Sequence, residues 1–179
     1  MIMPRMFAVL LGIASLGAPA GPGFAQPAAP DPAGEHAEFT LPPTWTYAHT
    51  NRRGLTRYMT KKNPKATLAV IIRHRTNTPS TPRDLTAAQA KDLKDHGFRI
   101  TREPEERTLG ASTWSWLRWE NVQSFKDSPT PFRGENYYTQ GRQIIVEVMV
   151  TGPTARFESF DRQEFERFLS SIRFVDPEH

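Results

Sequence analysis

Three glutamates in predicted strands are the side chains best placed for acid–base chemistry. Glu120, Glu135 and Glu147 lie in separate strand-like segments, and glycoside hydrolysis needs two carboxyl groups that flank the scissile bond. A converging pair of these glutamates would predict a hydrolase that acts on glycan. The alternative is a solvent-facing or ion-paired glutamate in each case, which is the usual state of this residue in proteins, and we favour it.

Other catalytic patterns are absent from the sequence. There is no cysteine, no G-x-S-x-G or S-x-x-K element and no glycine-rich phosphate loop. The histidines are widely spaced and do not form an HExxH or similar ligand pattern. The sequence therefore predicts no catalytic residue set, no metal site and no cofactor. The histidines are His36, His49, His74, His96 and His179.

The N-terminal 25 residues have the layout of a secretory signal peptide. Arg5 precedes the apolar run Met6–Leu16, and small residues end at Ala25. The run is shorter than the roughly 20 residues that a membrane-spanning helix needs, so we expect cleavage after Ala25, with Ala20 as the alternative. Residues Gln26–Ala37 contain three prolines and predict an extended tether. We therefore expect a secreted, periplasmic protein that keeps no transmembrane segment and binds no nucleic acid.

A basic run early in the mature chain is the main candidate for partner binding. It spans two predicted strands, and the proline-rich loop Ser124–Arg133 adds two phenylalanines. Such a surface suits an anionic envelope component or an acidic envelope protein. The alternative is solvated charge that protects an edge strand from aggregation. The candidate residues are Arg52, Arg53, Arg57, Lys61, Lys62, Lys65, Arg73, Arg75, Phe125 and Phe132.

The segment Thr113–Gln123 must lie at the centre of the fold. Alternation places Trp114 and Trp116 on one side of a sheet, and Leu117 and Trp119 on the other. A strand that is apolar on both faces needs cover on both faces. The alternative, an exposed aromatic platform that stacks on sugars or on a partner, is less favoured than a buried core.

Two helices are predicted to supply that cover. Thr81 is the expected N-cap of the first helix, which should run from Pro82 to His96 with Asp84 completing a capping box. Asp161 should cap the second helix with Glu164 at the box position. The apolar stripe of the second helix is Phe165, Phe168, Leu169 and Ile172.

Alternation and turn residues predict the remaining elements. A charged turn is expected at Glu103–Glu106, and Gly141-Arg142 is expected to form a type II′ turn in a hairpin. The domain is expected to open with Phe39–Tyr47, where Phe39 and Leu41 share a strand face and Pro42-Pro43 turn the chain before Trp45. The other predicted strands are Leu55–Lys62, Ala66–His74, Phe98–Arg102, Arg107–Leu109, Gly134–Gln140, Gln143–Thr151 and Arg173–Val175.

This order of elements predicts one α+β domain over residues 38–176, with a mostly antiparallel sheet sandwiched between helices. The size of 179 residues, of which 37% are hydrophobic, suits a single domain with appended segments.

Two short motifs resemble the PsbP-like family. Phe39–Trp45 is similar to the opening strand and proline-tryptophan turn of that family, and Glu166–Phe174 is similar to its closing helix and strand. The family includes an extrinsic oxygen-evolving-complex protein, DcrB-like bacterial envelope proteins and a Ran-binding import factor. The resemblance implies an antiparallel sheet between helices and a binding or accessory role without catalysis. No functional residue set transfers from the family to this sequence.

Overall fold

The computed structural model describes residues 35–50, 56–62, 65–74, 80–121, 131–158 and 162–176. The strands are β1 His36–Glu38, β2 Thr46–Thr50, β3 Thr56–Lys62, β4 Lys65–His74, β5 Arg99–Leu109, β6 Ser112–Glu120, β7 Phe132–Gln140, β8 Ile144–Pro153 and β9 Arg173–Val175. The helices are α1 Pro82–Asp95, α2 Thr154–Phe157 and α3 Arg162–Ser171. The expected signal peptide and most of the expected tether lie outside the described residues, as do the proposed cap Asp161 and most of the proline-rich loop.

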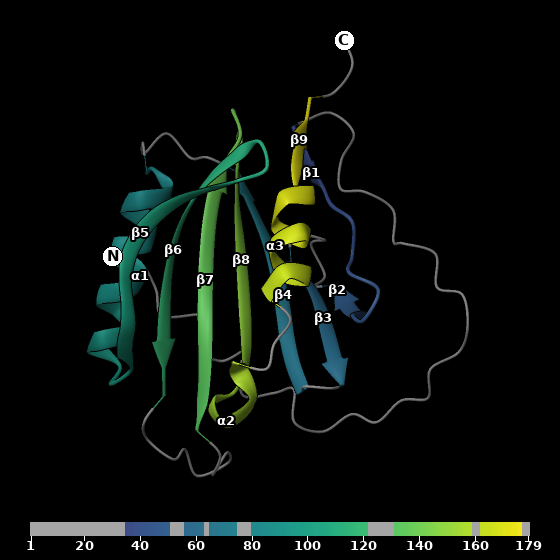
Figure 1. Ribbon diagram of the computed structural model, residues 1–179. Coiled ribbons are helices and arrows are strands. Elements are labelled where there is room, and N and C mark those ends of the chain that lie inside the picture. The colour runs from purple at the N-terminus through teal and green to yellow at the C-terminus, as the bar shows by residue number, and fades with distance from the viewer. Residues whose placement is uncertain are drawn as a thin grey trace.

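Seven strands form one antiparallel sheet in the order β2-β3-β4-β8-β7-β6-β5, and β1 pairs with β9 in a separate two-stranded ribbon (Figure 1). Every pairing within the seven-stranded sheet is antiparallel. The tryptophan-rich strand β6 lies between β5 and β7. The predicted α+β class and mostly antiparallel sheet are therefore confirmed.

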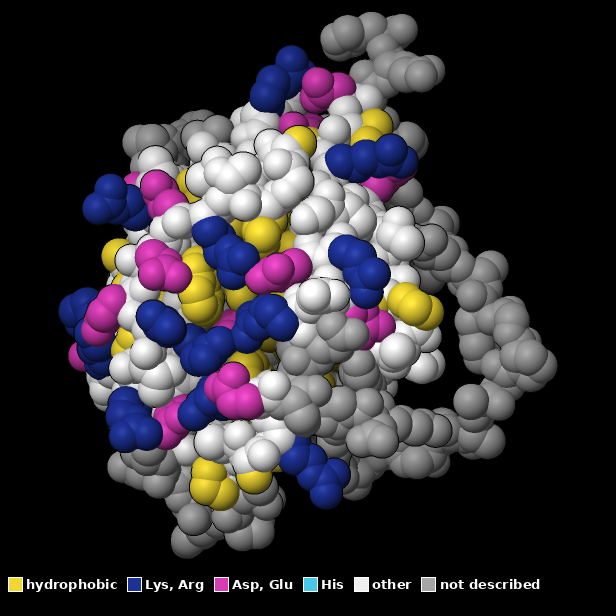
Figure 2. Space-filling view, viewed as in Figure 1, with side chains coloured by type: hydrophobic (Ala, Val, Ile, Leu, Met, Phe, Trp, Pro, Cys, Tyr) yellow, Lys and Arg dark blue, Asp and Glu magenta, His cyan; other side chains and the backbone are white. Residues whose placement is uncertain are grey.

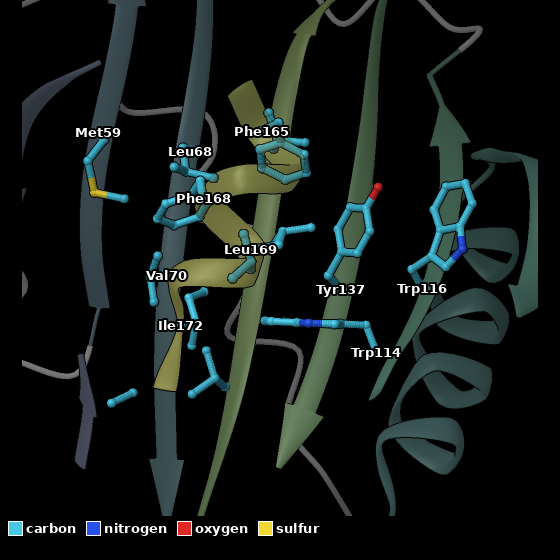
Figure 3. Close-up of a cluster of buried hydrophobic side chains, with 14 of the residues drawn as sticks. Met59, Leu68, Val70, Trp114, Trp116, Tyr137, Phe165, Phe168, Leu169 and Ile172 are labelled. Carbon is cyan, nitrogen blue, oxygen red and sulfur yellow. The ribbon is translucent and has the colours of Figure 1, made fainter. Parts of the chain in front are cut away.

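Each face of the sheet carries its own hydrophobic core. The first core contains Trp114 and Trp116 with alternate residues of β8 and the apolar stripe of α3 (Figure 3). The second contains Leu117 and Trp119 with Ala90 and Leu93 of α1. Trp114 is fully buried and Trp116 is 6% exposed. The prediction that β6 is apolar on both faces and covered on both is confirmed.

Helix α1 begins as its sequence predicts. The Thr81 hydroxyl accepts a hydrogen bond from the Asp84 amide at 3.1 Å, and the Asp84 carboxylate accepts one from the Thr81 amide at 3.0 Å. This is the expected capping box, which satisfies two of the free amides at the helix start. In α3, Glu164 instead reaches out of its helix, because its Oε1 accepts a hydrogen bond from the Thr44 hydroxyl at 2.6 Å.

Three local predictions are wrong. The strand face expected at Phe39 and Leu41 does not form, whereas the expected turn at Pro42-Pro43 does, since the Trp45 amide donates to the Pro42 carbonyl at 3.0 Å. The charged segment 103–106 continues β5 instead of turning, and two register shifts beside Arg102 absorb its irregularity. Gly141 does not form a type II′ turn, since Gly97 and Gly110 are the positive-φ glycines among the described residues.

Glu35, which precedes β1, instead organises the connection between β7 and β8. The Glu35 carboxylate accepts hydrogen bonds from the amides of Arg142, Gln143 and Ile144 at 2.8, 2.5 and 3.0 Å. Glu35 is 5% exposed. Glu35 and strand β1 thus contribute to the described fold together with residues 38–176.

No helix within the described ranges is long and apolar enough to cross a membrane.

Candidate binding surface on the open half of the sheet

Helix α3 covers only part of its face of the sheet. In Figure 1 it lies in front of β4, beside β8, and leaves β6 and β7 in view. The space-filling view from the same side shows basic and acidic side chains intermixed over this region, with hydrophobic side chains between them (Figure 2). These charges form one connected set that we call the arginine–glutamate ladder. Its members are Arg99, Arg118, Glu120, Arg133, Glu135, Glu158 and Arg162.

The register of β6 and β7 creates the centre of the ladder. Arg118 and Glu120 alternate with buried Trp119 and therefore share the face of Trp116. In the antiparallel pairing, Arg118 lies opposite Glu135, and Glu120 lies opposite Arg133. Each arginine thus faces a glutamate across the strand pair, which is a favourable cross-strand arrangement.

Glu135 is the most buried charge of the ladder, with no exposed surface. Arg118 donates to it through Nε at 2.7 Å, and Arg162 of α3 donates to both of its oxygens at 2.7 and 2.8 Å. The Tyr137 hydroxyl donates a further hydrogen bond at 2.7 Å. Four donors from β6, β7 and α3 therefore hold one carboxylate on the sheet.

These partners set the protonation of Glu135 and its neighbours. Burial alone would raise the pKa of Glu135, but hydrogen bonds from Arg162 and Tyr137 and the charges of Arg162 and Arg118 outweigh it and lower that pKa. Burial and the adjacent Glu135 charge raise the pKa of Tyr137. Glu135 is thus ionised and Tyr137 neutral near pH 7.

Glu120 is the second buried carboxylate of the ladder. Arg133 donates to its Oε2 through Nη2 at 2.9 Å, and Arg99 of β5 donates to its Oε1. The hydrogen bond from Arg133, followed by the bond and charge of Arg99, lowers the pKa of Glu120 against the opposing effect of burial.

Glu158, directly after α2, joins the two halves of the ladder. Its Oε1 accepts from Nη1 of Arg133 and lies 3.4 Å from Nη1 of Arg118. Its side chain is 64% exposed, whereas those of Glu120 and Glu135 are 8% and 0% exposed. Glu158 is therefore the one ladder carboxylate that solvent reaches readily.

Aromatic rings of the first core lie next to Arg118. Trp116 stacks on Tyr137 with 5.4 Å between ring centroids and an interplanar angle of 8°. The Arg118 guanidinium carbon lies 6.0 Å from the centroid of the Trp116 ring, within cation–π range. The tryptophans are thus core residues, and one of them forms the base of a charged surface.

Glu147 lies on the opposite face of the sheet. It has no exposed surface and accepts hydrogen bonds from Arg73 at 2.6 Å and from Asn136 and Tyr138 at 3.0 Å each. Asn136 in turn accepts from the indole of Trp119 at 2.7 Å. Burial and the Glu147 charge raise the pKa of Tyr138 well above its usual range. Glu147 and Glu120 therefore cannot flank one substrate bond.

The remaining glutamate pair also lacks the protonation that glycoside hydrolysis requires. Glu120 and Glu135 share a face, but both have lowered pKa values, whereas a general acid needs a raised pKa. A cavity of ≈ 380 Å³ at the end of the sheet has Glu106 as the carboxylate among its lining residues. The described ranges contain no group of three or more potential ligands placed to hold a metal ion.

The predicted partner-binding residues are spread over several places. Arg57, Lys61 and Lys62 lie on β3 and Lys65 and Arg73 on β4, with Lys62 opposite Lys65 in the register. Strand β3 is second from the sheet edge, inside β2. Arg73 is brought to Glu147, not to the ladder. The predicted residues Arg52, Arg53, Arg75 and Phe125 lie outside the described residues.

Phe132 begins β7 and is half-buried. Its ring makes edge-to-face contacts with Phe98 at 6.4 Å and with Trp119 at 5.7 Å between centroids. It therefore packs against the second core, on the face opposite the ladder.

Sequence reasoning missed the ladder although a signal for it exists. Strands β6 and β7 carry the same pattern of arginine, one intervening residue and glutamate, in Arg118-Trp119-Glu120 and Arg133-Gly134-Glu135. In an antiparallel pair with suitable register, this repeat places opposite charges face to face. The register itself depends on the loop between the strands, which the sequence pattern does not define.

Searches against family models and against curated proteins find no match. Solved structures do match. LpqN of Mycobacterium tuberculosis, described as involved in cell envelope biogenesis, aligns with a TM-score of 0.61 at 13% identity over 81% of this chain and 86% of LpqN.

Two further structures support the same fold. CyanoP, the cyanobacterial PsbP of Synechocystis sp. PCC 6803, aligns with a TM-score of 0.52 at 16% identity over 89% of this chain and 99% of CyanoP. A mutant form of Mog1 aligns with a TM-score of 0.53 at 11% identity over 78% of this chain and 91% of Mog1. At these identities the likeness concerns the fold alone. This chain has the PsbP-like fold.

Proposed function

We propose that this protein is a secreted, periplasmic binding or accessory module that performs no chemistry and docks a partner on the arginine–glutamate ladder. The observation that carries the proposal is the ladder itself, a connected charged surface on a part of the sheet that α3 leaves open. Its buried carboxylates have lowered pKa values, which suit permanent charge and not proton transfer.

Two further observations support this proposal. The N-terminal pattern of one basic residue, an apolar run and small residues is typical of a secreted protein. One protein of similar fold, LpqN, is described as involved in cell envelope biogenesis. Secretion is tested by cell fractionation and by the N-terminal sequence of the mature protein, which should begin at Gln26.

Capture of partners from envelope extract at low and high salt tests the proposed surface. The variant Arg99→Gln changes a ladder arginine whose side chain is 63% exposed, while Arg133 still pairs with Glu120. Its matched control is Arg173→Gln, an exposed arginine that pairs with Glu38 outside the ladder. We expect salt-sensitive capture that Arg99→Gln weakens and Arg173→Gln does not. Capture that is indifferent to salt and to Arg99→Gln would overturn the proposal.

A second candidate surface is the basic strand pair that the sequence predicts. The register places Lys62 opposite Lys65 at the end of the β3–β4 hairpin, which concentrates like charge there. An adaptor that binds an anionic envelope component through this region would lose capture when Lys61, Lys62 and Lys65 are changed to Gln. If that triple variant loses capture and Arg99→Gln retains it, the working surface is the strand pair and not the ladder.

A further inference from the structure

The ladder contains a receptor for one carboxylate, formed by two arginines on neighbouring strands. Arg118 directs Nε and Nη2 at Glu135, each at 2.7 Å. Arg133 directs Nε and Nη2 at Glu120, at 3.3 and 2.9 Å. Both arginines are thereby held in place, with side chains 18% and 19% exposed. The remaining terminal nitrogen of each arginine, Nη1, points to the same oxygen of Glu158.

Glu158, which occupies this receptor, is held much less firmly than Arg118 and Arg133. The Glu158 side chain is 64% exposed, and ion pairs that solvent reaches contribute only about 0–1 kcal/mol. It follows a single helical turn whose Phe157 is buried in the first core. The Glu158 side chain can therefore rotate away while the backbone of α2 stays anchored.

We infer that an acidic segment of a partner protein places a carboxylate between Arg118 and Arg133, and that Glu158 is an internal competitor for this position. The inference rests on the proposed binding function and names the chemistry of its partner. An incoming carboxylate accepts the same two Nη1 donors that Glu158 accepts, so no donor is left unpaired in the complex.

The surrounding charges favour single carboxylates on a peptide over a densely anionic surface. The ladder has four arginines and three glutamates, and withdrawal of Glu158 raises its formal charge from +1 to +2. Glu120 and Glu135 stay ionised on either side of the receptor. They repel a multiply charged phosphate or a continuous lipid surface, whereas spaced carboxylates can avoid them.

The test is binding of a fluorescein-labelled peptide in which three glutamates are separated by pairs of glycines, followed by fluorescence anisotropy at low and high salt. Glu158→Gln removes the competing charge and keeps the size of the side chain, so it should bind the peptide up to about fivefold more tightly. Its matched control, Glu38→Gln, removes an exposed carboxylate that pairs with Arg173 outside the ladder and should leave the affinity unchanged. Arg133→Lys keeps the charge but removes the guanidinium that pairs with Glu120 and supplies one of the two Nη1 donors, and it should weaken binding.

Each outcome supports or overturns the inference. Equal or weaker peptide binding by Glu158→Gln overturns it. A gain by Glu158→Gln toward inorganic phosphate or phosphatidylglycerol vesicles, without a gain toward the peptide, also overturns it and assigns the receptor to another anion. If Arg99→Gln abolishes capture from envelope extract while Glu158→Gln leaves peptide affinity unchanged, the proposed function stands and this inference fails. If Arg99→Gln leaves capture from envelope extract unchanged while Glu158→Gln gains affinity for the peptide, the proposed function fails.

Discussion

Glu135 shows how one buried charge is kept ionised on a mainly hydrophobic sheet. An ionised carboxylate without solvent is costly unless it is paired and hydrogen-bonded. Arg118, Arg162 and Tyr137 supply that pairing from three different elements. The same contacts connect β6, β7 and α3, so Glu135 also attaches the start of α3 to the sheet through Arg162.

The folded-state pKa of Glu135 lies below its ordinary value of 4.5, so its ion pairs stabilise the protein above that pH. Between the two values the unfolded chain binds the proton more tightly, and stability falls as pH falls. Glu135→Gln should cost about 3 kcal/mol near pH 7, since it leaves donors of the partly buried Arg118 and Arg162 unpaired. The difference from the unmodified protein should shrink when urea unfolding is repeated below pH 4.5.

The exposed ladder glutamate provides the comparison for this measurement. Glu158→Gln should change the free energy of unfolding by no more than about 1 kcal/mol, because its ion pairs are solvent-accessible. A cost for Glu135→Gln that matches this small value, or that does not depend on pH, would contradict the account of Glu135.

At the scale of elements, Glu35 connects the start of the domain to the β7–β8 connection. Its two oxygens accept from three consecutive amides, including the amide of buried Ile144. A Cβ on Gly141 would overlap the Glu35 carboxylate, so the glycine is needed for close approach and not for a positive φ. Strand β1, which pairs with β9 in the ribbon, begins at the residue after Glu35.

Glu35→Gln tests this attachment. The substitution replaces one accepting oxygen by an amide donor, so at least one of the three backbone amides loses its acceptor, at a cost of about 1–3 kcal/mol. We expect lower stability in urea and faster hydrogen exchange at Gln143 or Ile144. Glu38→Gln changes a nearby carboxylate on β1 that is 47% exposed, and it should show neither effect. Unchanged exchange in Glu35→Gln would mean that the carboxylate does not organise the turn.

Local patterns predicted some elements well and others poorly for identifiable reasons. The start of α1 depends on residues within four positions of each other, and Thr81 and Asp84 form the expected box. The irregular strand β5 depends on its pairing with β6, which absorbs extra residues by register shifts that no local signal marks. The glutamate at position 35 is distant in sequence from the turn that it caps.

At the scale of the whole molecule, one sheet separates two cores. Leu93 of α1 packs in the second core and Ile172, directly after α3, packs in the first. Residues on opposite faces have no shared partners, so their contributions to stability should be independent. Neighbours within the first core, such as Phe165 and Phe168 with ring centroids 6.1 Å apart, should be coupled.

A pair of double-mutant cycles measures this separation. Leu93→Ala should cost about 2–5 kcal/mol and Ile172→Val about 0.5–1.5 kcal/mol, and the double variant should show their sum to within about 0.5 kcal/mol. Phe165→Leu combined with Phe168→Leu should depart from additivity by more than that. Strong coupling between Leu93 and Ile172 in urea unfolding would show that the sheet transmits strain between its faces.

The fold class and the two-sided cover of β6 can be predicted from the amino-acid sequence, because side-chain alternation and helix caps depend on neighbours along the chain. The residues Trp114, Trp116, Leu117 and Trp119 lie on the faces that alternation predicts. Which charges meet cannot be predicted in this way, because ion pairing depends on strand register and on which part of a face a helix leaves open. Arg118, Arg133 and Glu158 are dispersed in the sequence, and folding brings them to one position on the sheet.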